Sequence, residues 1–317
     1  MQKELIMSTI TRAVNYLLHN RKQFLFSCVK NLGFLFPDKL YLSLIYRLKM
    51  GEWIDWKNPK TFTEKLQWLK LYDFKPEYTK MVDKYAVKDY VSSIIGEEYI
   101  IPTLGVWDKV EDIDWNSLPD KFVLKTTHGG GGCGVVICSD KSKFDRSAAE
   151  KKLSASMKVN AGKIYRERPY LKVPRRIIAE KFMEETTRPD VHDLMDYKFF
   201  CFDGEPRFLY VSDSPKHESV FLNTDWTLAG IGRDDYEPLK EVPAKPDNLD
   251  EMLNIARKLT KGTPHARVDL YNINEQIYFG EITFYTGSGF IPFNPKSFDL
   301  LIGDMLQLPD RIIGGGI

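Results

Sequence analysis

The sequence predicts an α+β fold preceded by a helical N-terminal segment. Apolar residues recur at helical spacing through much of the first 93 residues, whereas short β-rich runs separated by turn signals dominate after residue 120. Several of these runs follow one another as hairpins. The chain has 317 residues, 43% of them hydrophobic, which is enough apolar material for one large domain or two to three small ones.

Residues 1–57 are predicted to be helical, and residues 41–48 are the clearest amphipathic part. Basic residues in this segment lie among several phenylalanines, including Phe24 and Phe34. Two interpretations remain open: a helical cap on the core, or a peripheral membrane contact. No run approaches the roughly 20 apolar residues that span a bilayer, and no signal peptide or CxxC pair is evident. We expect a cytoplasmic protein, located at the inner face of the membrane if this segment contacts lipid.

The following region, 58–118, is predicted to begin with two helices. Thr61 or Thr63 can cap the first, and a second is expected over residues 78–93, ending before Gly96. A short β-rich run follows at 99–101. Residues 147–158 and 248–260 complete the predicted helices.

The predicted strands form pairs around turn signals. A glycine-rich turn separates 122–125 from 135–138, Asp203-Gly204 separates 197–202 from 207–211, and a short connection separates 265–271 from 277–284. A single strand is expected near 176–183. We expect domain boundaries that divide the chain into 1–57, 58–118, 119–184 and 185–317.

The glycine-rich turn predicts a ligand site. Its sequence, residues 125–135, is Lys-Thr-Thr-His-Gly-Gly-Gly-Gly-Cys-Gly-Val. Glycines let the backbone approach a ligand closely, and free N–H groups can cradle phosphate oxygens. The turn lacks the Gly-Lys-Ser/Thr of a Walker A loop, and a strand follows it instead of the helix of a Rossmann turn. The alternative is a flexible hairpin tip, although ordering four adjacent glycines costs considerable chain entropy.

Several cations accompany this loop. Lys125 enters it on a strand, where its ammonium could neutralise a bound phosphate. Lys88 lies upstream, and neighbouring Lys84 is interpreted as a surface lysine. Lys198 begins a strand of aromatics, where it is either an edge residue or directed at an anion. Among the five histidines, only His128 is expected near the site.

The C-terminal hairpin carries a second set of candidates. Arg267 and Asp269 alternate with apolar residues on one strand, as Glu281 and Thr283 do on the next. Alternation places each pair on one face of its strand. Two carboxylates on one face repel each other unless a cation lies between them. Mg²⁺ meets this need because it binds carboxylates together with phosphate oxygens. An ion-pair network around Arg267 is the alternative.

Local charge indicates a further surface. Residues 151–176 contain nine basic residues and one acid, Glu167, a net charge of +8, with Tyr165 and Tyr170 interleaved. This segment is either a solvated face or a docking surface for an anionic acceptor such as an acidic glycan. The overall net charge of +1 gives no indication of a nucleic-acid partner, and we expect none.

In this order, the motifs resemble the ATP-grasp superfamily and, more closely, the TupA-like ATP-grasp proteins of surface-polysaccharide biosynthesis. The similarity covers roughly residues 35–310. The matching stretches are 58–68 (NPKTFTEKLQW), 83–88 (DKYAVK), 122–132 (FVLKTTHGGGG), 196–204 (DYKFFCFDG), 266–271 (ARVDLY) and 280–290 (GEITFYTGSGF).

The resemblance implies an ATP-grasp fold, with two α+β lobes clasping ATP, and assigns roles within it. The residues implied to bind ATP are Lys88, Lys125, His128, Gly129, Gly130, Gly131, Gly132, Glu180, Phe182 and Glu185. Of these, Glu180 and Phe182 would meet adenine through their backbone at the hinge, and Glu185 would meet ribose. Lys198 and Arg267 would act in catalysis, and Asp269 and Glu281 would hold Mg²⁺. Thr283 stands where many ATP-grasp enzymes have asparagine, which puts a second Mg²⁺ in doubt.

The resemblance further implies an ATP-dependent carboxylate–amine ligase acting through an acyl phosphate. Its partners would be a uronic-acid-bearing glycan or precursor and an amino acid or amine. The alternatives are a glycan kinase, a glycosyltransferase of the same pathway, or a non-catalytic nucleotide-binding partner of that machinery.

Overall fold

The computed structural model describes residues 21–187, 194–213 and 216–310 and divides the chain into two compact units, Met1–Pro59 and Lys60–Ile317. Predictions for residues 1–20 lie outside the described residues. Among the described residues, no helix has the length and apolar character needed to cross a membrane.

Between residues 21 and 59, the described part of the first unit, two helices are joined by a short 3-10 turn. Helix α2 (Arg21–Asn31) leads through η1 (Gly33–Leu35) into α3 (Asp38–Met50), and the two helices pack together. The amphipathic helix predicted at 41–48 is confirmed within α3. It ends at Gly51, whose φ of 80° suits a residue without a side chain.

The second unit begins with three helices: α4 (Phe62–Tyr72), α5 (Pro76–Val82) and α6 (Ala86–Ile95). Thr61 caps α4 in a capping box with Glu64, which decides between the two predicted caps. The single helix predicted over 78–93 is wrong, because the Asp83 carboxylate accepts hydrogen bonds from the backbone N–H groups of Tyr85 and Ala86 and so starts a new helix.

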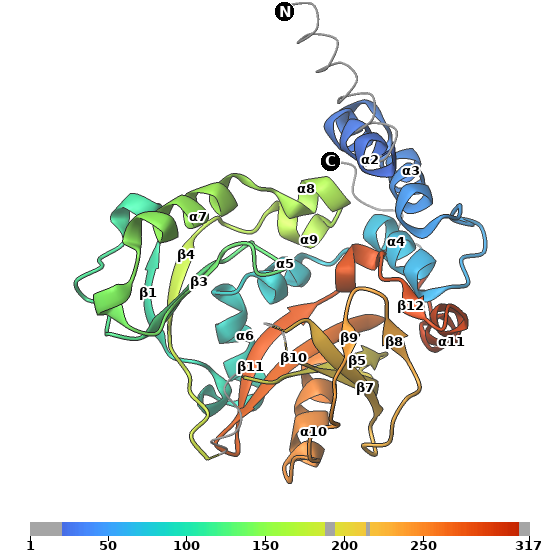
Figure 1. The fold of residues 1–317 in the computed structure, drawn as a ribbon. Helices are drawn as coiled ribbons and strands as arrows, with labels where there is room; N and C mark the ends of the chain where they lie inside the picture. The colour runs from blue at the N-terminus through green and yellow to red at the C-terminus, as the bar shows by residue number, and fades with distance from the viewer. Residues whose placement is uncertain (1–20, 188–193, 214–215, 311–317) are drawn as a thin grey trace, which may run out of the picture. The chain divides into compact units, whose positions relative to one another are not determined.

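One lobe of this unit is a four-stranded antiparallel sheet in the order β1-β4-β2-β3 (Figure 1). Its strands are β1 (Thr103–Trp107), β2 (Phe122–Thr126), β3 (Val135–Cys138) and β4 (Ile177–Lys181). Helix α7 (Arg146–Lys158) packs on β2 and β3 and shares a core with them. The β-rich run expected at 99–101 is corrected: a 3-10 turn, η2 (Glu97–Tyr99), precedes the strand, which starts after Pro102.

Two short helices, α8 (Ala161–Tyr165) and α9 (Arg168–Leu171), lie between α7 and β4 in the chain. These two helices form the middle of the basic segment 151–176. Helix α9 packs against α5.

The other lobe is a six-stranded sheet in the order β11-β10-β5-β6-β7-β9. The strands are β5 (Asp196–Phe202), β6 (Glu205–Asp213), β7 (Glu218–Asn223), β9 (Glu237–Pro238), β10 (His265–Ile273) and β11 (Gln276–Thr283). Helix α10 (Leu249–Thr260) packs on β5, β6 and β10, as Figure 1 shows. A small pair, β8 (Gly232–Arg233) and β12 (Phe293–Asn294), and helix α11 (Ser297–Met305) complete the lobe.

The predicted α+β class and the three predicted hairpins are confirmed. Each predicted strand pair lies antiparallel: β2 with β3, β5 with β6, and β10 with β11. The apolar residues that alternate with the charged ones on β10 and β11, Val268, Leu270, Ile282 and Phe284, are all buried in the core. The charged residues therefore share the opposite face of the sheet.

Candidate functional site

Strands β10 and β11 bring their charged residues side by side. Asp269 lies opposite Glu281, and Arg267 lies opposite Thr283, which is the register that the sequence left open. A bulge at Gly280 permits this register, because a Cβ there would lie 3.0 Å from the Asp269 carbonyl oxygen. The absence of a side chain at Gly280 thus allows the two carboxylates to meet.

The Arg267 guanidinium connects both carboxylates. Its Nε lies 2.6 Å from Asp269 Oδ1, and its Nη2 lies 2.7 Å from Asp269 Oδ2 and 3.1 Å from Glu281 Oε1. The same Nη2 donates to Thr283 Oγ1 at 3.2 Å. The ion-pair network considered as the alternative to a metal is therefore present, with Arg267 at its centre.

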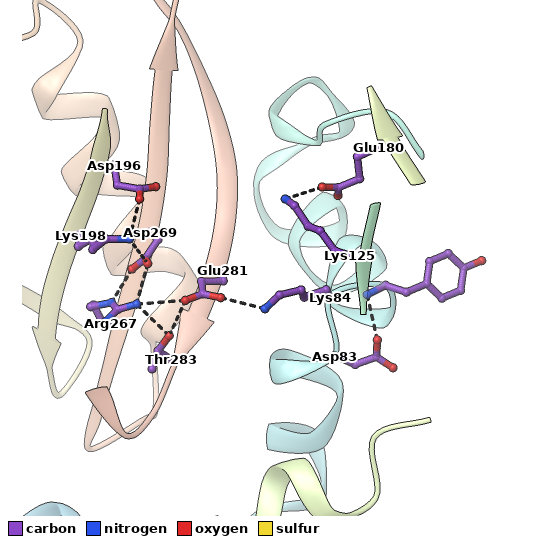
Figure 2. Close-up of polar contacts among 11 residues, drawn as sticks. Asp83, Lys84, Lys125, Glu180, Asp196, Lys198, Arg267, Asp269, Glu281 and Thr283 are labelled. Carbon is purple, nitrogen blue, oxygen red and sulfur yellow. Dashed lines mark hydrogen bonds and ion pairs between the residues drawn. The ribbon is translucent and has the colours of Figure 1, made fainter. Parts of the chain in front are cut away.

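Lys198 joins this network from β5. Its Nζ lies 2.7 Å from Asp269 Oδ2 and 3.1 Å from Asp196 Oδ2 (Figure 2). Strand β5 is an interior strand of the sheet, so the interpretation of Lys198 as an edge residue is wrong. Burial lowers the pKa of Lys198, but the two aspartates outweigh it and raise that pKa well above its usual value. Lys198 is a buried, permanently charged cation.

Lys84 reaches the network from the break between α5 and α6. Its Nζ lies 3.0 Å from Glu281 Oε2, and its backbone N–H donates to the Thr127 carbonyl at 3.1 Å. The interpretation of Lys84 as a surface lysine is wrong. The available sequence signal was Asp83, an N-cap residue type that would have placed Lys84 at the start of a helix.

Glu180 joins the two lysines that were predicted to meet ATP phosphates. Its carboxylate lies 2.7 Å from Lys125 Nζ and 2.6 Å from Lys88 Nζ. Burial raises the pKa of Glu180, but these lysines outweigh burial and lower it to about 2. At Lys125, Glu180 outweighs burial and raises the pKa, whereas at Lys88 burial dominates and lowers the pKa.

The Glu180 side chain is thus an internal counter-ion. The predicted contact of its backbone with adenine stays a prediction. Two other residues predicted at the hinge also have described contacts: the Phe182 ring lies 5.9 Å from Lys121 Nζ, and Glu185 accepts a hydrogen bond from the Asn274 backbone at the turn of the β10–β11 hairpin.

The glycine loop joins β2 to β3 with a packed base and an open tip. A Cβ on Gly129 or Gly134 would lie 2.5 Å or 2.1 Å from Thr126 Oγ1. At Gly130, Gly131 and Gly132 nothing lies within 4 Å of such an atom, and the last two have positive φ. Only the base therefore requires glycine for packing, and the tip has open space around it.

His128 lies at the base of the loop and not at its tip. The residue is buried, and its Nε2 lies 3.3 Å from the Ser156 carbonyl oxygen. Burial lowers its pKa, so the ring is held neutral. In the structure this side chain contacts α7 at the base of the loop. Its role in nucleotide binding stays a prediction.

Helix α9 packs against α5, and α5 contacts β11. Burial raises the pKa of the Tyr170 hydroxyl, and the carboxylates of Glu167 and Glu281 raise it further. Within the described part of the chain, seven basic residues of segment 151–176 have no ion-pair partner: Lys151, Lys152, Lys158, Lys163, Arg168, Lys172 and Arg175.

A family model of the TupA-like ATP-grasp proteins matches residues 64–307. This chain belongs to the TupA-like ATP-grasp family. The matched region contains both lobes and every residue of the charged network. The predicted resemblance is confirmed, and with it the ATP-grasp fold. ATP-grasp enzymes are ATP-dependent ligases that form C–N bonds, and they generally bind ATP with Mg²⁺.

Solved structures similar to this TupA-like chain include other ATP-grasp proteins. The D-alanine–D-alanine ligase of Bacillus anthracis complexed with ATP is 15% identical over 64% of this chain and 53% of the ligase, with a TM-score of 0.37. A RimK domain protein of Sphaerobacter thermophilus is 12% identical over 72% of this chain and 69% of that protein, with a TM-score of 0.39. The match thus spans about half of the ligase. No match is found among curated proteins.

The two carboxylates on β10 and β11, which are paired with cations in this structure, are of the chemical type that holds Mg²⁺ supplied with a nucleotide. Asp269 and Glu281 place two carboxylates side by side, and Mg²⁺ in phosphate-transfer sites takes one or two carboxylates together with phosphate oxygens and water. Among the described residues, no group of three or more acidic, histidine or cysteine side chains could hold an ion alone. Phosphate oxygens would therefore complete the coordination.

Proposed function

We propose that this protein is an ATP-dependent ligase that joins a carboxylate to an amine through an acyl phosphate. The observation that carries the proposal is the set of three cations along Asp269 and Glu281. Arg267 and Lys198 are buried, and the half-buried Lys84 reaches Glu281 from between α5 and α6 (Figure 2). Three cations beside a candidate metal site suit the stabilisation of a transferring phosphoryl group. Family membership supports the reaction class.

In the proposed reaction, a substrate carboxylate oxygen attacks the γ-phosphorus of ATP. The bond to the bridging oxygen breaks, ADP leaves, and an acyl phosphate forms. The amine nitrogen then attacks the acyl carbon and loses its proton, and phosphate departs. Lys125 and Lys88 would hold the ATP phosphates. Mg²⁺, when bound at Asp269 and Glu281, supplies charge neutralisation for the phosphates.

Two residues would act on the reacting groups themselves. Lys198 would face the γ-phosphate, and Arg267 would steady first the transferring phosphoryl group and then the tetrahedral oxyanion. Both are buried, and a charge in a buried site interacts more strongly with a developing anion than it does in water. The open tip of the glycine loop would close and keep water away from the acyl phosphate.

We further propose that one substrate is an acidic glycan or a uronate precursor of a surface polysaccharide, and the other an amino acid. Support comes from the unpaired cations of segment 151–176, whose helix α9 packs against α5, which in turn contacts β11. Fixed positive charge next to the site would concentrate an anionic acceptor there.

The reaction is tested by incubating the protein with ATP, Mg²⁺, a glycuronate and a panel of amino acids. ADP and phosphate formation that requires both substrates is expected, and it should stop when EDTA removes the metal. Release of AMP, or no substrate-dependent ADP, would contradict the acyl-phosphate scheme. Stable transfer of ³²P from γ-labelled ATP to the glycan would identify a kinase, and a requirement for a nucleotide sugar would identify a glycosyltransferase.

The acceptor is tested with Lys158→Gln/Lys163→Gln, two exposed positions of the basic segment. We expect KM for the glycuronate to rise several-fold while KM for ATP stays unchanged. Lys258→Gln, an exposed lysine on α10, is the matched control. An unchanged KM for the glycuronate would leave the ligase chemistry standing and contradict the anionic acceptor surface.

A further inference from the structure

Exposed apolar side chains are concentrated in a short part of the first unit. Two of them, Phe34 and Leu35, are 74% and 62% exposed in η1. The same 12-residue stretch contains three more, each nearly half exposed. The members of this N-terminal apolar surface are Phe24, Leu25, Leu32, Phe34 and Leu35. Soluble proteins seldom leave such a cluster uncovered, and clusters of this kind mark interaction sites.

The spacing of these residues places most of them on one side. Leu25, Leu32 and Leu35, three of the five, lie seven and three positions apart. The backbone stays helical through them because Leu32 N–H donates to the Cys28 carbonyl and Leu35 N–H to the Leu32 carbonyl. Residues three to four apart share one helical face. The surface is therefore a stripe and not a scatter of single residues.

Charge around this stripe has one sign. No Asp or Glu occurs between Glu4 and Asp38, whereas Arg12, Lys22 and two further cations, Arg21 and Lys30, lie within this interval. Arg21 and Lys30 are exposed on α2 itself. Residues 5–37, which include the apolar surface, thus carry a net positive charge.

These properties favour one occupant. An anionic bilayer offers an apolar interior to phenylalanine and leucine and negative headgroups to arginine and lysine. A second copy of the chain could cover the apolar side chains, but it would bring the like charges of α2 together, which is unfavourable. Charge complementarity therefore selects a lipid surface over self-association.

We propose that α2 and η1 attach this protein peripherally to an anionic membrane surface. Phe34 and Leu35 enter the boundary between headgroups and acyl chains, and Arg21 and Lys30 face the headgroups. This attachment is independent of the reaction proposed for the second unit, because it requires neither ATP nor a substrate.

Vesicle sedimentation tests the attachment with the full chain. Vesicles of phosphatidylcholine mixed with phosphatidylglycerol are compared with vesicles of phosphatidylcholine alone. We expect the protein to bind the mixed vesicles, with binding at least about 10-fold weaker for Phe34→Ser/Leu35→Ser. Leu228→Ser removes an equally exposed leucine of the second unit and should bind as the unsubstituted protein does.

A charge-reversed variant tests the electrostatic part. Arg21→Glu/Lys30→Glu should also weaken binding to the mixed vesicles by about 10-fold or more, and added salt should weaken binding of the unsubstituted protein. Equal binding by the unsubstituted protein and Phe34→Ser/Leu35→Ser, or no binding to mixed vesicles, would overturn the proposal. Failure to bind together with a dimer that this double variant dissociates would assign the surface to self-association instead.

Discussion

The ion pairs of Glu180 predict a specific dependence of stability on acid. Its pKa is about 2 in the folded protein, against 4.5 for an unperturbed glutamate. Because folding lowers this pKa, the stabilisation is complete above pH 4.5 and is lost as the pH falls through about 2. The difference corresponds to ~3 kcal/mol, of which ~2 kcal/mol disappears between about pH 5 and about pH 3.

The substitution Glu180→Gln removes this pH-dependent contribution to stability. At pH 7 it should lower the free energy of unfolding by about 3–5 kcal/mol, because it leaves the half-buried ammonium groups of Lys88 and Lys125 without their shared carboxylate. Its stability should then fall by ~2 kcal/mol less than that of the unsubstituted protein between about pH 5 and about pH 3.

Urea unfolding followed by tryptophan fluorescence measures both effects. The control is Glu184→Gln, which removes a carboxylate 2.7 Å from Lys121 in a pair whose side chains are 45% and 49% exposed. An exposed pair contributes roughly 0–1 kcal/mol, so this variant should keep the pH dependence of the unsubstituted protein. If Glu180→Gln also keeps that dependence, the lowered pKa does not belong to Glu180.

Three substitutions address the candidate site. Lys84→Met should lower the rate of ATP consumption by roughly 100-fold, because one cation beside the transferring group is lost. The control is Lys80→Met, which replaces an exposed lysine on α5 and should leave the rate unchanged. Equal rates for the two variants in initial-velocity assays would exclude Lys84 from the site. Gly134→Ala should lower the free energy of unfolding by about 1–3 kcal/mol through overpacking, whereas Gly130→Ala, with open space around it, should change urea unfolding little. Asp269→Asn should abolish ATP consumption and, by removing one carboxylate partner from each of two buried cations, lower the melting temperature; full activity would exclude Asp269 from the catalytic site.

Short-range patterns were enough to predict much of the fold. The alternation of charged and apolar residues on β10 and β11 depends only on the two-residue period of a strand, and the glycine loop was recognisable because glycines between two β-rich runs indicate a hairpin. The Thr61 cap is equally local, since its partner Glu64 lies three residues away.

The sequence by itself therefore determined which residue types the two lobes offer: a glycine hairpin, a basic segment, and a strand pair bearing Arg267, Asp269 and Glu281. Only the tertiary structure decided how their charges are matched. Lys84 meets Glu281 across 197 residues of chain, and Glu180 lies between two lysines because β4 pairs with β2. Contacts at such separations depend on the packing of whole elements, and packing leaves no periodic signal in the sequence.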